Sequence, residues 1–134
     1  MQLHPKTDGE PRRATGPERL ARTRRALPDA LSYAYRRGHV QLAESGPDNI
    51  FSFTIVETEL VAFIRVRYMA RIRATPDEIA AEFRESLQRL RAIVENSAIS
   101  RELWIRSKHG TFRFFRLTER GLVEINEHGQ PLPV

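Results

Sequence analysis

The start of one helix is the clearest structural signal in this chain. Thr75-Pro76-Asp77-Glu78 combines an N-cap hydroxyl, a proline at the first helical position and a glutamate placed to bond back to the cap. Apolar residues then recur at helical spacing, at Ile79, Phe83, Leu87, Leu90 and Val94. The pattern predicts a helix over about 76–96, with one apolar face that packs against the rest of the fold.

Two segments of β-type composition precede this helix. Residues 50–56 and 60–68 are rich in β-branched and aromatic side chains, and only Glu57-Thr58-Glu59 separates them. They predict a hairpin. In its second strand Arg65 and Arg67 lie on one face, because side chains alternate between the two faces of a strand. That part of the face must reach water or an anion.

The remaining patterns complete an α+β domain. Pro28-Asp29 is typical of a helix start, and Gly38 is placed to cap the end of that helix. Weak alternation over 39–44 predicts a strand, and 101–106 with 111–118 predict a second hairpin that a short edge strand at 122–125 could extend. We expect a mixed or antiparallel sheet of about five strands with two flanking helices, in the order αβββαββ.

The domain boundaries follow from composition. The first sixteen residues are rich in proline, glycine, threonine and charge, which favours disorder. We therefore expect a disordered basic arm over 1–25, a single α+β domain over 26–126 and a C-terminal tail over 127–134.

Composition also excludes several classes of site. The chain contains no cysteine, so disulfides, thiolate metal sites and a cysteine nucleophile are excluded. Its longest apolar run, Leu60 to Ile64, is far shorter than the ~20 residues of a membrane span. We expect a cytoplasmic protein with no membrane partner. The four histidines, His4, His39, His109 and His128, have no zinc-ligand spacing.

Positive charge is concentrated at the front of the chain. Residues 1–40 contain nine basic and four acidic residues, a net +5, whereas residues 41–134 contain thirteen of each sign and net to zero. Such a basic segment can attract a phosphate backbone by releasing counterions, without reading sequence. The alternative is a solvated tail with no ligand.

Pro47-Asp48 stands just before the strand that begins at Ile50, and the acids Glu57 and Glu59 follow it. Together with the predicted order of elements, αβββαββ over about residues 28–118, this resembles the core of the restriction-endonuclease-like nucleases, the PD-(D/E)xK superfamily. The resemblance implies an acid near the second core strand and an acid-x-lysine triplet on the next. It implies Asp48, Glu57 and Glu59 as candidate catalytic residues and ligands of Mg²⁺ or Mn²⁺ in metal-assisted phosphodiester hydrolysis.

The chain departs from that family pattern at the triplet. Glu57-Thr58-Glu59 has glutamate where the family has lysine, and Arg65-Val66-Arg67 has arginine where the family has an acid. Arginine stays protonated, so it can hold phosphate but does not replace lysine in proton handling. The resemblance therefore implies a degenerate core, and local roles remain alternatives for these acids: an Asx-turn for Asp48 and a charged hairpin tip for Glu57 and Glu59.

Three functions are compatible with these patterns. The first is a non-catalytic nucleic-acid-associated module without a cofactor, which contacts phosphate through arginines: Arg24, Arg25, Arg36, Arg37, Arg65 and Arg67, with Arg71 and Arg73 beside them. The second is the metal-dependent nuclease. The third is an assembly subunit, whose aromatic sheet face binds a protein partner or a second copy of the chain. Trp104, Phe112 and Phe114 could instead stack bases, although core packing is the commoner role of such aromatics.

Overall fold

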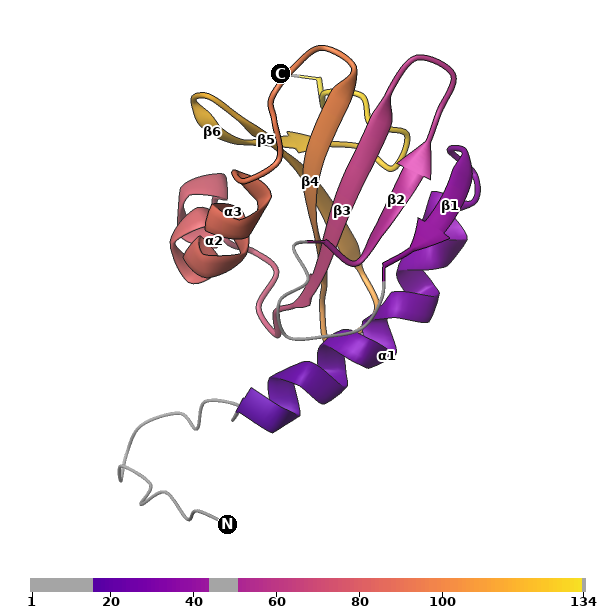
Figure 1. Ribbon diagram of the computed structural model, residues 1–134. Coiled ribbons are helices and arrows are strands. Elements are labelled where there is room, and N and C mark those ends of the chain that lie inside the picture. The colour runs from indigo at the N-terminus through magenta and orange to yellow at the C-terminus, as the bar shows by residue number, and fades with distance from the viewer. Residues whose placement is uncertain (1–15, 44–50, 134) are drawn as a thin grey trace, which may run out of the picture.

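The computed structural model describes residues 16–43 and 51–133, with side chains from residue 25 onward. One six-stranded sheet carries helices on both of its faces (Figure 1). The elements are α1 (Gly16–Ala34), β1 (His39–Leu42), β2 (Phe53–Val56), β3 (Val61–Tyr68), α2 (Pro76–Glu82), α3 (Arg84–Leu90), β4 (Ile99–Arg106), β5 (Phe112–Thr118) and β6 (Gly121–Ile125). The predicted α+β class is confirmed, with six strands and three helices in place of about five and two.

The strands lie in the sheet in their order along the chain, β1-β2-β3-β4-β5-β6. Every neighbouring pair is antiparallel except β3 and β4, which are parallel. A parallel pair needs a crossover, and the segment that carries α2 and α3 supplies it. The sheet is therefore mixed. Both of its faces are covered, one by α1 and the other by α2 and α3 (Figure 1).

Helix α1 packs through a stripe of alanines. Ala26, Ala30 and Ala34 recur every fourth residue and are fully buried against the sheet. Small side chains let the helix axis approach the strands closely. The prediction that Pro28-Asp29 begins this helix is wrong, since Pro28 lies inside it. A proline ring removes one helical hydrogen bond, a loss that the packing of α1 on the sheet offsets here.

Gly38 is required for a reason other than the one predicted. Its backbone is not in the left-handed conformation of a helix cap. A Cβ at this position would lie 2.4 Å from the carbonyl oxygen of Val56. The glycine therefore permits the close approach of the chain to β2 as β1 begins.

The helix predicted over 76–96 is two short helices. Its start is confirmed, because the Thr75 hydroxyl accepts from the Glu78 amide and the Glu78 carboxylate accepts from the Thr75 amide. Phe83 then leaves helical geometry at φ −110° and ψ 33°. The break lets α2 pack near β6 while α3 packs on β3 and β4, and α3 ends at Leu90.

The aromatic face of the sheet belongs to the core. Trp104 is fully buried, with ring centroids 5.5 Å from Phe53 and 4.8 Å from Phe114. Tyr33 of α1 covers Phe114 and Phe112 at 5.3 and 5.2 Å. The helix on this face is therefore α1, and Trp104 presents no surface on which a base could stack.

The predicted arm and tail are partly structured in the described residues. Helix α1 begins at Gly16, inside the predicted arm, while residues 1–15 lie outside the described ranges. In the C-terminal segment Pro131 forms a β-bridge with Ile125, and Gly129 is buried. None of the described helices has the length and hydropathy to cross a membrane.

Candidate functional site

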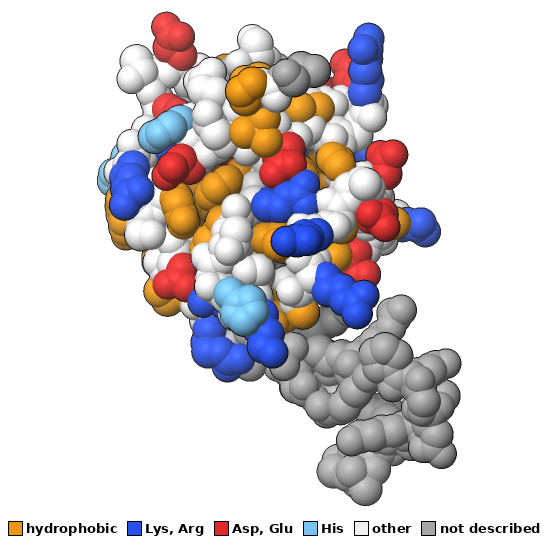
Figure 2. Space-filling view, turned by 180° about the vertical axis from the view of Figure 1, so that it is seen from behind, with side chains coloured by type: hydrophobic (Ala, Val, Ile, Leu, Met, Phe, Trp, Pro, Cys, Tyr) orange, Lys and Arg blue, Asp and Glu red, His pale blue; other side chains and the backbone are white. Residues whose placement is uncertain are grey.

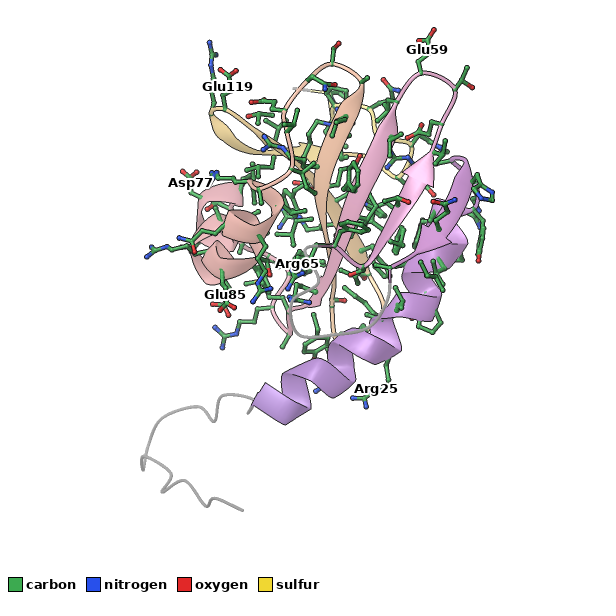
Figure 3. All side chains as sticks on the ribbon, viewed as in Figure 1. Arg25, Glu59, Arg65, Asp77, Glu85 and Glu119 are labelled. Carbon is green, nitrogen blue, oxygen red and sulfur yellow. The ribbon has the colours of Figure 1, made fainter. Side chains whose placement is uncertain are left out.

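The acids predicted as metal ligands do not converge among the described residues. Glu57 points to the α1 face of the sheet, where its carboxylate accepts from Arg37 at 2.7 Å. Glu59 is exposed at the tip of the β2–β3 hairpin, at the opposite end of β3 from Arg65 (Figure 3). Asp48 lies outside the described residues. Within those residues no group of three or more histidine and acidic side chains could hold a metal ion.

A fully buried carboxylate, Glu102 of β4, organises the α1 face. The Ser100 hydroxyl donates to it at 2.7 Å and the Trp104 indole N–H donates at 3.0 Å. Arg37, just after α1, donates from both terminal nitrogens at 2.8 and 3.1 Å. Its guanidinium also lies 6.0 Å from the centre of the Trp104 ring. Every contact in this network stabilises a charge that is closed off from water.

In this network the effect of ion pairing on the pKa values of Glu102 and Arg37 is larger than the effect of burial. Burial by itself would raise the pKa of Glu102, but the hydrogen bonds and charge of Arg37, with the bonds from Trp104 and Ser100, lower it below the ordinary value. Burial would lower the pKa of Arg37, and the hydrogen bonds and charges of Glu102 and Glu57 instead raise it. Both groups stay ionised. The Arg37 side chain is only 2% exposed, so its role is to stabilise the fold.

The opposite face of β3 carries a cluster of arginines, which we call the β3–α3 arginine cluster: Arg65, Arg67 and Arg89. Arg65 is buried at 8% exposure, and Arg67 is half-buried. Arg67 Nε donates to the Ser86 hydroxyl of α3 at 3.1 Å, and its Nη1 donates to the Val66 carbonyl at 3.1 Å. The cluster therefore lies between β3 and α3 (Figure 3).

Like charges in this cluster act on one another. Burial, followed by the positive charges of Arg67 and Arg89, lowers the pKa of Arg65 to about 10. Burial and the charge of Arg89 also lower the pKa of Arg67. Glu85 opposes both shifts, but its side chain is 83% exposed and pairs with Arg89 at 3.5 Å. An anion bound here would raise these pKa values, so the protonated cluster favours an anionic ligand.

Further basic side chains surround the end of the sheet at which β3 and β4 finish. Arg71 and Arg73 are exposed in the connection from β3 to α2, and Lys108 is exposed in the β4–β5 turn with His109. Figure 2 shows Lys and Arg side chains gathered around a histidine at this lower end of the molecule. We call this region the basic end.

The predicted phosphate-binding arginines divide between different environments. Arg25 is exposed on α1 near the basic end (Figure 3), and Arg24 lies in the part of α1 whose side chains are not described. Arg36 is exposed at the other end of α1 and lies 3.5 Å from Glu127. Arg37 is buried on Glu102 and Glu57. Of the predicted set, Arg25, Arg65 and Arg67 lie at or beside the basic end.

Sequence reasoning missed the Glu102 network. In β4, Glu102, Trp104 and Arg106 alternate with Leu103 and Ile105, which is the pattern of a strand with one solvated face. The parallel pairing of β3 with β4 and the approach of α1 bury that face instead. The tryptophan between two charged residues was the available signal, since an indole N–H in a core needs an acceptor.

Comparison with protein-family models and with curated protein sequences finds no match to this chain. The functional argument therefore rests on the geometry of the described residues.

Proposed function

We propose that this domain is a nucleic-acid-associated binding module, non-catalytic, that contacts a phosphate backbone through the arginines of its basic end. The observation that carries the proposal is the β3–α3 arginine cluster, which gathers three guanidinium groups between β3 and α3. Burial, followed by the charges of Arg67 and Arg89, lowers the pKa of Arg65 there to about 10. A phosphate bound near the cluster would offset that repulsion.

The distribution of charge supports the same ligand. The N-terminal part of α1, whose sequence includes Arg19, Arg22, Arg24 and Arg25, lies at the basic end (Figure 1). Arg25 and the exposed Arg71 and Arg73 add charges around the cluster. A surface of this kind holds a polyanion through several separate contacts, none of which identifies a base.

The order of elements is also compatible with this proposal. A helix, three antiparallel strands, a pair of helices and a strand parallel to the third strand follow one another. This order is the one on which the resemblance to a restriction-endonuclease-like core rests. By fold analogy, a domain with that core and a degenerate metal site keeps affinity for nucleic acid without cleaving it.

Salt-dependent binding tests the proposal. The full chain is titrated into labelled single-stranded and duplex DNA and RNA at several salt concentrations, and anisotropy gives the affinity. We expect log K to fall linearly with log salt, by about 0.7 to 0.9 per phosphate contact. Arg71→Gln with Arg73→Gln lowers both the affinity and the slope. Arg120→Gln, which removes one exposed charge in the turn between β5 and β6, is the matched control and leaves the slope nearly unchanged.

Two outcomes would reject this function. One is an affinity that does not change with salt, or no binding at the lowest salt concentration. The other is cleavage of the nucleic acid in Mg²⁺ or Mn²⁺ that Asp48→Ala abolishes, which would favour the metal-dependent nuclease with Asp48, Glu57 and Glu59 as its acids.

A further inference from the structure

The sheet forks between β4 and β5 at the end remote from the basic end. Their ladder runs from Arg106 opposite Phe112 to Glu102 opposite Arg116, and it stops there. Beyond this point β4 remains paired with β3 as far as Ile99, and β5 remains paired with β6 as far as Thr118. The two strands thus separate while each keeps its other neighbour.

A pocket of about 360 Å³ lies at this fork, which we call the fork pocket. It is lined by the start of β4, the end of β5 and the C-terminal segment around Gly129. The volume is near the lower limit for small-molecule sites, at roughly 300 Å³. Two arginines, Arg101 and Arg116, and one acid, Glu95, line it. The buried Glu102 carboxylate lies behind the wall, 3.7 Å from Arg116.

Arg101 is buried but only loosely engaged. Its side chain is 7% exposed. Its terminal nitrogens reach the Ile93 carbonyl at 3.3 Å, the Leu117 carbonyl at 3.5 Å and the Glu95 carboxylate at 3.8 Å. A guanidinium bound to a carboxylate or a phosphate makes contacts of about 2.7 to 2.9 Å. A ligand with anionic oxygens would therefore satisfy this group better than its present partners do.

Arg116, on the other wall, is held firmly. Its Nε donates to Ser100 at 2.8 Å and its Nη2 donates to the Gly129 carbonyl at 2.9 Å. Ser100 in turn donates to the buried Glu102 at 2.7 Å, which ties the wall to the core. Among the described residues none accepts a hydrogen bond from Arg116 Nη1. The guanidinium is thus pre-positioned, with one nitrogen left for a ligand.

We propose that the fork pocket binds a small organic oxyanion, a carboxylate or a phosphate ester, between Arg101 and Arg116. Glu95 is 45% exposed and stands at the rim of the fork pocket, where the ligand replaces it as the partner of Arg101. This site goes beyond the proposed function. It uses other residues at the other end of the sheet, so failure of either proposal leaves the other intact.

Amide NMR of the full chain tests the fork pocket. Sodium phosphate and sodium acetate are titrated separately, with sodium chloride at matched ionic strength as the reference. We expect saturable shifts at the amides of Arg101, Leu117 and Gly129 with at least one of the two oxyanions. Saturation with phosphate alone assigns a phosphate ester, and saturation with acetate alone assigns a carboxylate. Shifts that are absent, or that chloride reproduces, would overturn the proposal.

Three variants give the test its specificity. Arg116→Gln weakens binding about tenfold or more, because it removes a charged donor. Arg101→Lys keeps the positive charge but loses the planar guanidinium with its paired donors, so it weakens binding less than Arg116→Gln does. Glu95→Gln tightens binding, since it removes the competing carboxylate. Arg120→Gln is the control and leaves binding unchanged. Weaker binding in Glu95→Gln, or an equal loss in Arg120→Gln, would refute the proposed site.

Discussion

Buried arginines on the two faces of the sheet have pKa values shifted in opposite directions. On the α1 face Arg37 meets two carboxylates, Glu102 and Glu57, and its pKa is raised. On the α2 and α3 face burial, followed by the positive charges of Arg67 and Arg89, lowers the pKa of Arg65 to about 10. The residue type is the same and the burial is similar. What differs is the sign of the neighbouring charges.

This difference separates a structural arginine from one that suits a ligand. A guanidinium matched by internal carboxylates has its charge balanced inside the fold, and moving it toward a ligand would break its hydrogen bonds to Glu102 and Glu57. Guanidinium groups that repel one another gain stability when an anion arrives. Burial of an arginine by itself therefore does not indicate function, and the neighbouring charges must be included.

The largest expected effect is on the α1 face. Glu102→Ala removes the carboxylate that balances Arg37 and leaves Ser100 and Trp104 without their acceptor. We expect a loss of about 3 to 5 kcal/mol in the free energy of unfolding, measured with urea. Glu119→Ala, which removes an exposed carboxylate, is the matched control and should change it by less than ~0.5 kcal/mol. Equal effects would refute the structural role of the network.

Acid sensitivity should come from the same carboxylate. The pKa of Glu102 is lower in the folded protein than the ordinary 4.5, so the ionised group stabilises the fold above that pH. This stabilisation is lost as the pH falls from 4.5 through the folded pKa. Urea unfolding at a series of acidic pH values should show a shallower loss for Glu102→Gln than for the natural sequence. Parallel curves would contradict this assignment.

The arginine cluster should show the reverse pattern, with a small effect on stability and a clear effect on binding. Arg67→Met loses the hydrogen bonds to Ser86 and Val66, but it also removes a positive charge beside Arg65. We expect the free energy of unfolding to change by no more than ~1 kcal/mol. The affinity for nucleic acid, measured by anisotropy, should fall severalfold. A destabilisation as large as that of Glu102→Ala would remove the contrast between the two faces.

The smallest effect should follow from Glu85→Gln. Glu85 is the exposed acid that opposes the charge of Arg65 and Arg67. Its removal should raise the affinity for nucleic acid about twofold at low salt, with a change in unfolding free energy under ~0.5 kcal/mol. The gain should disappear at high salt, because exposed charges are screened. A lower affinity in this variant would argue against a phosphate ligand at the cluster.

Much of the fold could be predicted from local sequence patterns. The capping box at Thr75 and Glu78 forms as predicted, because every group it needs lies within four residues. The segments around β2 and β3 pair as a hairpin, because β-branched and aromatic side chains are enriched in strands. The bend at Phe83 could not be predicted from the sequence, because it depends on where β6 and β4 lie beneath the two helices.

The candidate sites divide in the same way. The arginines of β3 were identified from alternation along a single strand, which places Arg65 and Arg67 on one face. The burial of Arg37 was not identified, because its partners Glu57 and Glu102 are distant in the chain. The fork pocket was not visible either, since it depends on where the ladder between β4 and β5 stops.

The sequence by itself determined the α+β class, the start of α2, the β2–β3 hairpin and the concentration of positive charge at the front of the chain. These features depend on residues that are neighbours along the chain. Only the tertiary structure decided that Arg37 forms buried ion pairs with Glu102 and Glu57, and that Glu59 and Arg65 lie at opposite ends of β3. The reason is that the free energy of a charge depends on every group around it in space, and a linear pattern records only those beside it in the chain.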